Sequence, residues 1–343
     1  MIIMKKTTIK NFLFIALTAT ALAACSSDGG NDGGNGGSSS SANTNKNTSF
    51  SDKAATRVEV PHLQGGNSQF IAYRTTDTGF DKDGVNYCVE WDKDLKANRW
   101  ACYILTKSNI NGNGQRWSGD RTVSQTSTAA AYFFDTKNLS LDDYYYRTEN
   151  GSYSDYLYRS GFDHGHLCNS NDRTYNSASK TAVGEINKQT FYLTNMQPQY
   201  SVFNGSSREH QYKGLWLTME NFVHNFVAKG SKFGTNDTLF VCKGGTIDSE
   251  DQILKRIDNK LIVPKYYYAA VVWKRTSLNV YSGIAFWFEH TNEYHGDDSL
   301  KGYAISIDEL EKKLGGKIDF FCNLPDETEN AVEKTAATMD FGL

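Results

Sequence analysis

Runs of aromatic and β-branched residues recur along most of the chain and constrain its fold more than any other feature. Such residues favour the pleated, half-buried backbone of a β-strand, and the Gly, Asn and Asp residues between the runs are typical of turns. The runs occupy residues 70–75, 85–91, 100–106, 189–194, 238–241, 265–273 and 281–288. We therefore expect a folded body that is mostly sheet.

Helical signals are fewer. Apolar residues fall on one face at helical spacing between residues 215 and 227, and Gly230 supplies a stop. A second helix is predicted over residues 307–314, because Ser306 and Glu309 have capping-box spacing and Gly315-Gly316 follows. Residues 327–336 give a weaker third signal. The apolar face of the first helix consists of Leu215, Trp216, Met219, Phe222, Val223, Phe226 and Val227.

The first 52 residues have the pattern of a targeting segment and a tether. Lysines precede a short apolar run that ends in small residues, so residues 1–24 are predicted to be a signal peptide. Leu22-Ala23-Ala24-Cys25 resembles a bacterial lipobox, which predicts a lipid on Cys25; the alternative is a secreted protein in which Cys25 has no such role. Of the 23 residues from 26 to 48, 19 are Gly, Ser, Asn or Asp. We expect residues 25–52 to form a flexible tether and residues 53–343 one domain.

Charge and hydropathy exclude some classes of protein. The mean hydropathy of −0.55 and the lack of an apolar run of eighteen residues argue against several membrane spans. Removing residues 1–24, which hold three lysines and no acid, takes the formal charge from −3 to −6. A general basic coat for holding nucleic acid is therefore excluded, although a local basic site is not.

The five cysteines after Cys25 would lie in a compartment that permits disulfides. Cys88 and Cys102 are placed symmetrically about the turn of a predicted hairpin, which favours a bridge between them. Cys242 and Cys322 are our expected second pair. Cys168 would then be free.

Chemically active residues are concentrated in residues 160–173, SGFDHGHLCNSNDR. In an extended backbone His164 and His166 share a face, and Gly165 leaves room for close approach. Three interpretations are open at this stage: a catalytic segment, a polar strand end with hydrogen-bonded histidines, or a zinc site. The zinc site would use His164, His166, Cys168 and Asp163, whose types suit zinc but whose spacing does not match paired zinc ligands.

Residues 191–204, FYLTNMQPQYSVFN, form a second candidate segment. The pattern indicates a buried strand that runs into the amides Asn195, Gln197 and Gln199, with Asn204 five residues later. Amides at a strand end are also found as turn caps.

Together, DHGH at 163–166, TNMQPQ at 194–199, FN at 203–204 and GLWLTME at 214–220 resemble the DNA/RNA non-specific endonucleases of the ββα-metal, or His-Me finger, class, a group that includes endonuclease G. The order and spacing match, and the resemblance extends from about residue 58 to 332. It implies an α+β fold in which helices flank a central antiparallel sheet that carries a ββα-metal site.

The resemblance also implies roles for single residues. His166 would be the general base and Asn204 the direct ligand of Mg²⁺, for which Mn²⁺ is a possible substitute. Asn195 and Glu220 would hold the ion's waters and orient the site, and Asp163 belongs to the same catalytic segment. For Glu220 an exposed helix position is the alternative, since it lies at the edge of the apolar face.

Two departures from the family pattern affect substrate binding. His164 stands where the family has Arg, so we expect His164 to contact phosphate weakly, and Arg173 or Arg159 to supply the missing guanidinium. The step from Asn204 to Trp216 is longer than the family's. We expect this loop to bulge into solvent; if it arches over the site instead, Arg208 would bind substrate.

The sequence thus predicts a Mg²⁺-dependent endonuclease that cuts DNA and RNA, anchored by lipid to a bacterial envelope on its periplasmic or outer face. The rival from another class is a nucleic-acid-binding lipoprotein with the same fold and little or no turnover. The sequence leaves the oligomeric state open.

Overall fold

The computed structural model describes residues 42–48, 50–110, 114–117, 135, 137–144, 160–176 and 184–343. A seven-stranded sheet dominates the body, with the spatial order β1-β2-β3-β6-β9-β10-β11, and every neighbouring pair is antiparallel. Its strands are β1 (Ser68–Arg74), β2 (Val85–Asp92), β3 (Ala97–Leu105), β6 (Thr238–Gly245), β9 (Tyr266–Arg275), β10 (Val280–Glu289) and β11 (Ala304–Ile305). The predicted α+β fold with a central antiparallel sheet is therefore confirmed.

Two small ribbons and a set of helices complete the body. The ribbons pair β4 (Asp163–His166) with β5 (Met196–Gln199), and β7 (Ile253–Ile257) with β8 (Leu261–Pro264). The helices are α1 (Lys107–Ile110), α2 (Glu185–Gln189), α3 (Ser201–Asn204), α4 (Leu215–Ala228), α5 (Ile307–Lys313), α6 (Asp326–Glu333) and α7 (Thr338–Phe341).

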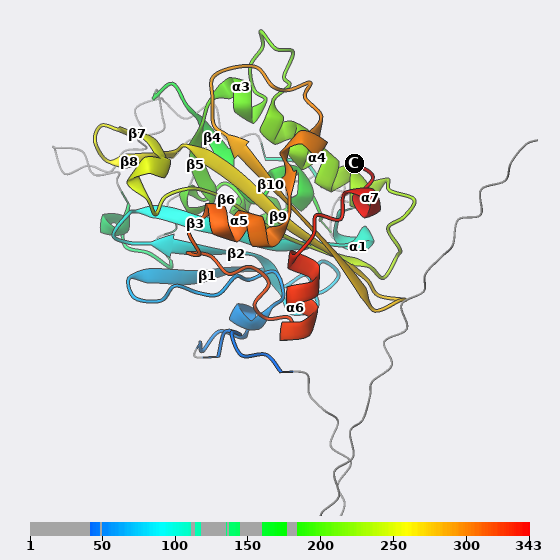
Figure 1. Cartoon of the computed structure of the whole chain (residues 1–343). Coiled ribbons are helices and arrows are strands. Elements are labelled where there is room, and N and C mark those ends of the chain that lie inside the picture. Colours follow the sequence, from blue (N-terminus) through cyan, green and yellow to red (C-terminus); the bar gives the residue numbers. More distant parts are fainter. Residues whose placement is uncertain are drawn as a thin grey trace, which may run out of the picture. The chain divides into compact units, whose positions relative to one another are not determined.

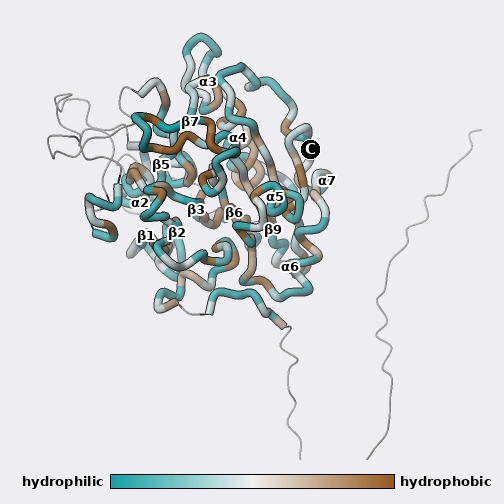
Figure 2. The backbone as a smooth tube through the Cα atoms, turned by 60° about the vertical axis from the view of Figure 1, so that its left-hand side comes forward, coloured by the Kyte–Doolittle hydropathy of each residue, from teal (hydrophilic) through white to brown (hydrophobic). Residues whose placement is uncertain are grey.

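Each face of the sheet has its own apolar core. Because side chains alternate along a strand, β3 sends Ala101, Tyr103 and Leu105 into one core and Trp100 and Cys102 into the other. The first core also contains the apolar face of α4, whereas the second contains the buried residues of α5 and α6. Figure 1 shows α5 crossing the strands, with α6 beside it. Figure 2 shows hydrophobic residues gathered in the inner strands and hydrophilic residues in the outer loops.

The helix predictions hold closely. Helix α4 buries the predicted face, including Trp216 and Met219. In α5 the Ser306 side chain accepts a hydrogen bond from the backbone N–H of Glu309, and Gly315 and Gly316 beyond its end both have positive φ. Helix α6 corresponds to the weaker third signal. No helix in the described parts of the chain is long and apolar enough to cross a bilayer.

The strand predicted over residues 189–194 is wrong. The backbone there turns on itself: the N–H of Thr190 donates to Asn187 O at 3.0 Å, and that of Asn195 to Tyr192 O at 2.9 Å. These bonds satisfy the backbone locally, so residues 193–195 form a 3₁₀ turn and β5 begins at Met196. Aromatic and β-branched composition gave a strand signal that local hydrogen bonding overrides.

Both predicted disulfides are also wrong, since all five described cysteines are buried free thiols. Cys88 and Cys102 do face each other across β2 and β3, but Cys242 is the register partner of Cys102 on its other side. Cys322 lies elsewhere, where its thiol donates to Val60 O at 3.8 Å. It is therefore not the partner of Cys242.

Part of the expected tether belongs to the folded body. Asn47 is only 2% exposed, and its amide nitrogen donates to the backbone oxygens of Ala55 and Pro61, each at 3.0 Å. Asn43 donates to Leu324 O at 2.5 Å. Asparagine side chains that bond backbone groups in this way order a segment whose composition suggested flexibility. Residues 1–41, with the predicted leader and Cys25, lie outside the described residues.

Candidate active site

The β4–β5 ribbon carries the first part of the site. Asp163, His164, Gly165 and His166 pair in register with Gln199, Pro198, Gln197 and Met196. A Cβ atom at Gly165 would overlap the buried side chain of Gln199, so only glycine fits there. The close packing fixes β4, and its two histidines line the same pocket.

This pocket has a volume of about 520 Å³. Its walls come from β4, from the 3₁₀ turn at Ser170–Arg173 with the residue before it, from the end of α3 and from one side of α4. The lining residues are Arg116, Phe162, Asp163, His164, His166, Asn169, Ser170, Asn171, Asn204, Gly205, Ser206, Leu217 and Glu220. The structure therefore brings His166, Asn204 and Glu220 together, although 54 residues separate the first from the last.

His166 is held by its backbone and by its ring. Its carbonyl oxygen accepts a hydrogen bond from Trp216 Nε1 at 3.2 Å, and its ring meets the ring of Phe191 edge to face, with the centroids 4.9 Å apart. Burial lowers the pKa of His166 well below 6.5, and the positive charge of Arg116, His164 and Lys243 lowers this pKa further. His166 is therefore neutral at physiological pH and able to accept a proton.

Asn204 is oriented by Asp163. The amide nitrogen of Asn204 donates to Asp163 Oδ2 at 2.9 Å, and the hydroxyl of Ser206 donates to the same oxygen. This bond assigns the nitrogen to Asp163, which leaves the side-chain oxygen of Asn204 as the atom to hold a cation. A hard ion such as Mg²⁺ prefers oxygen ligands and keeps several waters, so one amide oxygen in a hydrated pocket suits it. Asp163 therefore fixes the orientation of the Asn204 side chain.

Glu220 forms a buried ion pair with a residue that our sequence analysis missed. Its Oε1 lies 2.8 Å from Nζ of Lys243, a side chain that is only 1% exposed. The same Nζ lies over the Trp216 ring, 5.3 Å from the ring centroid. Burial raises the pKa of Glu220, while Lys243 opposes that rise. The exposed position that was the alternative for Glu220 is excluded, since the residue is 8% exposed. The sequence did contain a signal for this pair, since a lysine in the otherwise apolar strand β6 would need a buried partner.

Arg116 is the second residue that sequence reasoning missed, and it borders the pocket beside His164. Its Nε donates to Ser170 Oγ at 2.7 Å, and its guanidinium lies 5.1 Å from the centroid of the Phe191 ring. An arginine so held presents a positive charge to the pocket. Nothing in its local sequence distinguishes it from other loop arginines.

Arg173 does not reach the pocket. It is fully buried, its guanidinium donates to the backbone oxygens of Asp172 and Ile104, and it is stacked 4.4 Å from the centroid of Tyr103. The expected phosphate contact from Arg173 is therefore wrong, because the side chain is buried and its two terminal nitrogens bond backbone oxygens inside the body. Arg159, the other expected source of a guanidinium, lies outside the described residues.

Asn195 is also turned inward. Its amide nitrogen donates to Cys168 O at 3.0 Å and Thr190 O at 2.9 Å, and its oxygen accepts from Cys168 N at 2.8 Å. These bonds orient the chain that follows His166. Asn195 does not line the pocket, so it cannot hold an ion's waters directly in this arrangement.

Beyond Ser206, the long loop before α4 packs away from the pocket. His210 stacks on Tyr294 with centroids 4.5 Å apart, and Lys213 pairs with Asp297 at 2.8 Å. Arg208 is exposed and does not line the pocket. The structure thus agrees with a bulge into solvent, and a substrate contact from Arg208 is not supported.

The zinc alternative fails on geometry. Within the described chain, the donor atoms of His164, His166, Cys168 and Asp163 do not converge on a common point. Cys168 is buried, and burial raises the pKa of its thiol to about 12, which disfavours the thiolate that zinc requires.

Comparison with known proteins identifies the family of the chain. Residues 67–327 match the family described as DNA/RNA non-specific endonuclease. A Nostoc sp. (strain PCC 7120) protein called "Nuclease" is 27% identical over 179 residues, which cover 51% of this chain and 56% of that protein. A chain of the crystal structure of the EndoG/EndoGI complex is 18% identical with a TM-score of 0.47, over 71% of this chain and 85% of that chain. Because the family match covers most of the body, the chain belongs to the DNA/RNA non-specific endonuclease family.

Proposed function

We propose that this protein is a Mg²⁺-dependent endonuclease that hydrolyses phosphodiester bonds in DNA and RNA without regard to sequence or sugar. The observation that carries the proposal is the meeting of His166, Asn204 and Glu220 in one pocket. The match to the DNA/RNA non-specific endonuclease family supports the reaction class.

The base of the reaction is His166. A phosphodiester repels hydroxide, so hydrolysis needs a water that is activated beside the phosphorus. His166 is neutral because burial and nearby positive groups depress its pKa. It takes a proton from water and leaves an attacking hydroxide, and a group in this role commonly contributes about 10²- to 10⁴-fold to the rate.

The side-chain oxygen of Asn204 would hold the cation, while Asp163 keeps the side-chain amide in place. When bound, Mg²⁺ supplies positive charge to the phosphate and to the leaving oxygen. The carboxylate of Glu220, fixed by Lys243, faces the same pocket and would accept hydrogen bonds from the ion's waters. Mn²⁺, which takes similar oxygen ligands, is expected to substitute.

Two basic side chains at the pocket favour contact with the phosphate rather than with the nucleobase. Arg116 and His164 lie at its wall and would attract the charged backbone that every nucleotide shares. Arg116 takes over the role that sequence reasoning gave to Arg173. Contacts of this kind carry no sequence information, which accounts for cleavage of both DNA and RNA.

The test is digestion of plasmid DNA and of total RNA by purified protein, with Mg²⁺ and with excess EDTA. We expect both substrates to be degraded with Mg²⁺, and His166→Ala to remove the activity. Binding of nucleic acid without cleavage at any metal concentration would instead establish the rival, a binding lipoprotein on the same fold.

We also propose attachment to the bacterial envelope through a lipid on Cys25, on the sequence evidence of Leu22-Ala23-Ala24-Cys25. Changing Cys25 to Ser should move the protein from the membrane fraction to the soluble fraction. A wild-type protein that is already soluble after processing would contradict the anchor without affecting the proposed nuclease activity.

A further inference from the structure

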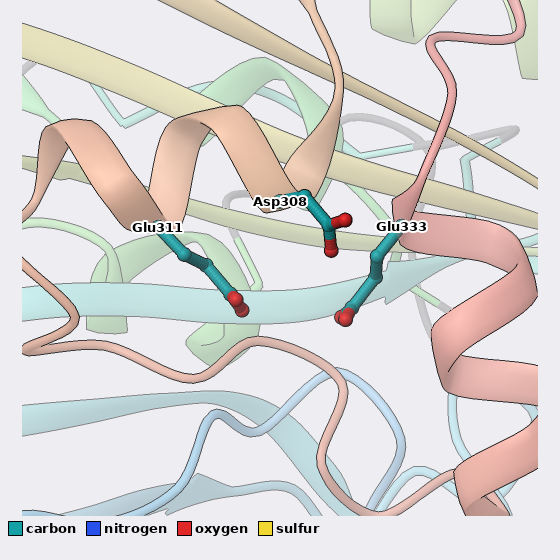
Figure 3. A group of neighbouring side chains, drawn as sticks. All are labelled: Asp308, Glu311 and Glu333. Atoms are coloured by element: carbon teal, nitrogen blue, oxygen red, sulfur yellow. The ribbon is translucent and has the colours of Figure 1, made fainter.

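Three carboxylates converge on the face of the sheet opposite the active site. Asp308 and Glu311 lie one turn apart on α5, and Glu333 is the last residue of α6. One oxygen of each lies within 4.8 Å of an oxygen of the other two. Figure 3 shows the three side chains pointing into the same space between the two helices.

Glu333 gives a second, independent reason to look for a ligand there. The residue is 5% exposed, and its Oε1 is fully buried without a hydrogen-bond partner among the described residues. A buried carboxylate oxygen that makes no hydrogen bond is costly. Its place at the carboxyl end of a helix adds to the cost, because the helix dipole is negative there.

The surroundings of Glu333 are acidic. Glu311, Glu329, Asp319 and Asp308 all lie close enough to Glu333 to act on it electrostatically. Asn45 donates to both Asp319 and Glu329, at 3.1 and 2.8 Å, which satisfies that pair. Glu311 accepts from the N–H of Phe320 at 2.8 Å.

We propose that Asp308, Glu311 and Glu333 bind a calcium ion that ties α5 to α6. Carboxylate oxygens are the ligands that hard cations prefer. Three atoms within 4.8 Å of one another leave a point no more than about 2.8 Å from each, close to the roughly 2.3–2.6 Å of Ca²⁺–oxygen bonds. Mg²⁺ needs about 2.0–2.1 Å and near-octahedral ligands, so it fits this open triangle less well.

Calcium would join two helices that otherwise repel at this point. Both helices pack on the same core, through Ile307 and Leu310 of α5 and Val332 of α6. A cation between them cancels the repulsion of their carboxylates and adds bonds across the contact. The site is thus structural, and it is independent of the pocket that contains His166.

The experiment measures calcium binding directly, in the folded protein with Asn204 changed to Ala so that the active site does not contribute. Metal-free protein is titrated with CaCl₂ by calorimetry at pH 7.5, and its melting temperature is recorded with EDTA and with 10 mM CaCl₂. We expect one site with a Kd of about 10⁻⁴–10⁻³ M and, at 10 mM CaCl₂, a rise in Tm of about 3–10 °C.

The variants decide which residues hold the ion. Glu333→Gln and the milder Asp308→Asn, which changes a partly exposed side chain, should each lose the binding heat and the calcium-dependent rise in Tm. Glu309→Gln is the matched control, because Glu309 is on α5 but is 54% exposed and pairs with Lys313. No binding heat in the parent protein, or equal binding after Asp308→Asn and Glu333→Gln, would overturn the proposal; the carboxylates would then share protons alone.

Discussion

Glu220 and Glu333 are buried to a similar extent, 8% and 5% exposed, on opposite faces of one sheet. Glu220 meets the ammonium of Lys243 at 2.8 Å, whereas Glu333 meets other carboxylates. Burial raises the pKa of both, but only Glu220 has a nearby cation that opposes the rise. The difference teaches that burial alone does not set the state of a carboxyl group. The side chain that faces it acts on the pKa as well.

Charged side chains are therefore partnered differently on the two faces of the sheet. On the active-site face, Lys243 pairs with Glu220, and Arg116 donates a hydrogen bond to Ser170. On the opposite face, here called the outer face, three carboxylates meet with no cation among the described residues around them. The first arrangement keeps groups in place for chemistry, and the second suits an ion taken up from solution.

The largest effect that separates the two faces is expected at His166. His166→Ala should lower the cleavage rate by about 10²- to 10⁴-fold, because the water loses its proton acceptor. The melting temperature should remain near that of the wild type, and so should its calcium-dependent rise. Initial rates on one DNA at saturating Mg²⁺, with circular dichroism of the same samples, provide the measurement. Wild-type rates for this variant would remove His166 from the mechanism.

Breaking the Glu220–Lys243 ion pair should leave a buried carboxylate without a cation on the active-site face, as on the outer face. Lys243→Met leaves Glu220 buried without a counter-charge and should cost about 3–5 kcal/mol of unfolding free energy. Urea denaturation measures this loss. Lys274→Met is the matched control, because Lys274 is half-buried on the adjacent strand β9 and should change stability by less than about 0.5 kcal/mol.

A double variant tests whether the cost in Lys243→Met comes from the stranded carboxylate. Adding Glu220→Gln to Lys243→Met should restore part of the lost stability, since the remaining amide carries no charge. If the double variant is less stable than Lys243→Met, the loss would be one of packing around Trp216 and Tyr103 and not of charge.

On the outer face the same reasoning predicts that removing a charged group increases stability. The folded state raises the pKa of Glu333 from 4.5 to about 10, so without a cation this group costs stability as the pH rises above 4.5. Glu333→Gln in EDTA should therefore be more stable than the wild type by about 1–3 kcal/mol at pH 8, and nearly equal to it at pH 4. Urea melts at the two pH values measure the difference. A loss of stability at pH 8 would show that the charged form is favoured.

The smallest effect is expected at His164, which shares the pocket with His166 but lies one strand repeat away. His164→Ala should reduce the rate by less than about tenfold, since a phosphate contact at the rim is lost while the base remains. His164→Arg should keep or raise the rate, because arginine binds phosphate with two hydrogen bonds. Assays at pH 8 on the DNA used for His166→Ala allow direct comparison. An inactive His164→Ala beside an active His166→Ala would reverse the two assignments.

Local signals in the sequence predicted much of the fold. Aromatic and β-branched runs located most strands of the sheet, helical spacing located α4, and the Ser306–Glu309 pair located the start of α5. His166, Asn204 and Glu220 were placed in one site by their resemblance to a family. The strand and helix signals each lie within a few residues of what they predict, whereas the site was predicted from the order of motifs spread over residues 163–220.

The rest depends on contacts between distant segments. Lys243 becomes part of the site only because β6 passes beneath α4, and Arg116 only because its loop packs on Phe191. Arg173 looked free for substrate, yet Tyr103 and the backbone of Ile104 enclose it. The three carboxylates of α5 and α6 come from two helices whose approach no local pattern indicates.

The docking of residues 42–48 has a consequence for how the body meets its surroundings. Asn43, Asn45 and Asn47 bond to residues 319–329 and to the turn near Ala55, on the face that carries α5 and α6. Figure 1 shows this first segment, in blue, at the end of the body away from α3 and β4. The polypeptide thus enters the domain behind the pocket. A surface that held the protein by this end would not have to cover the pocket, so a long polymer could still reach it.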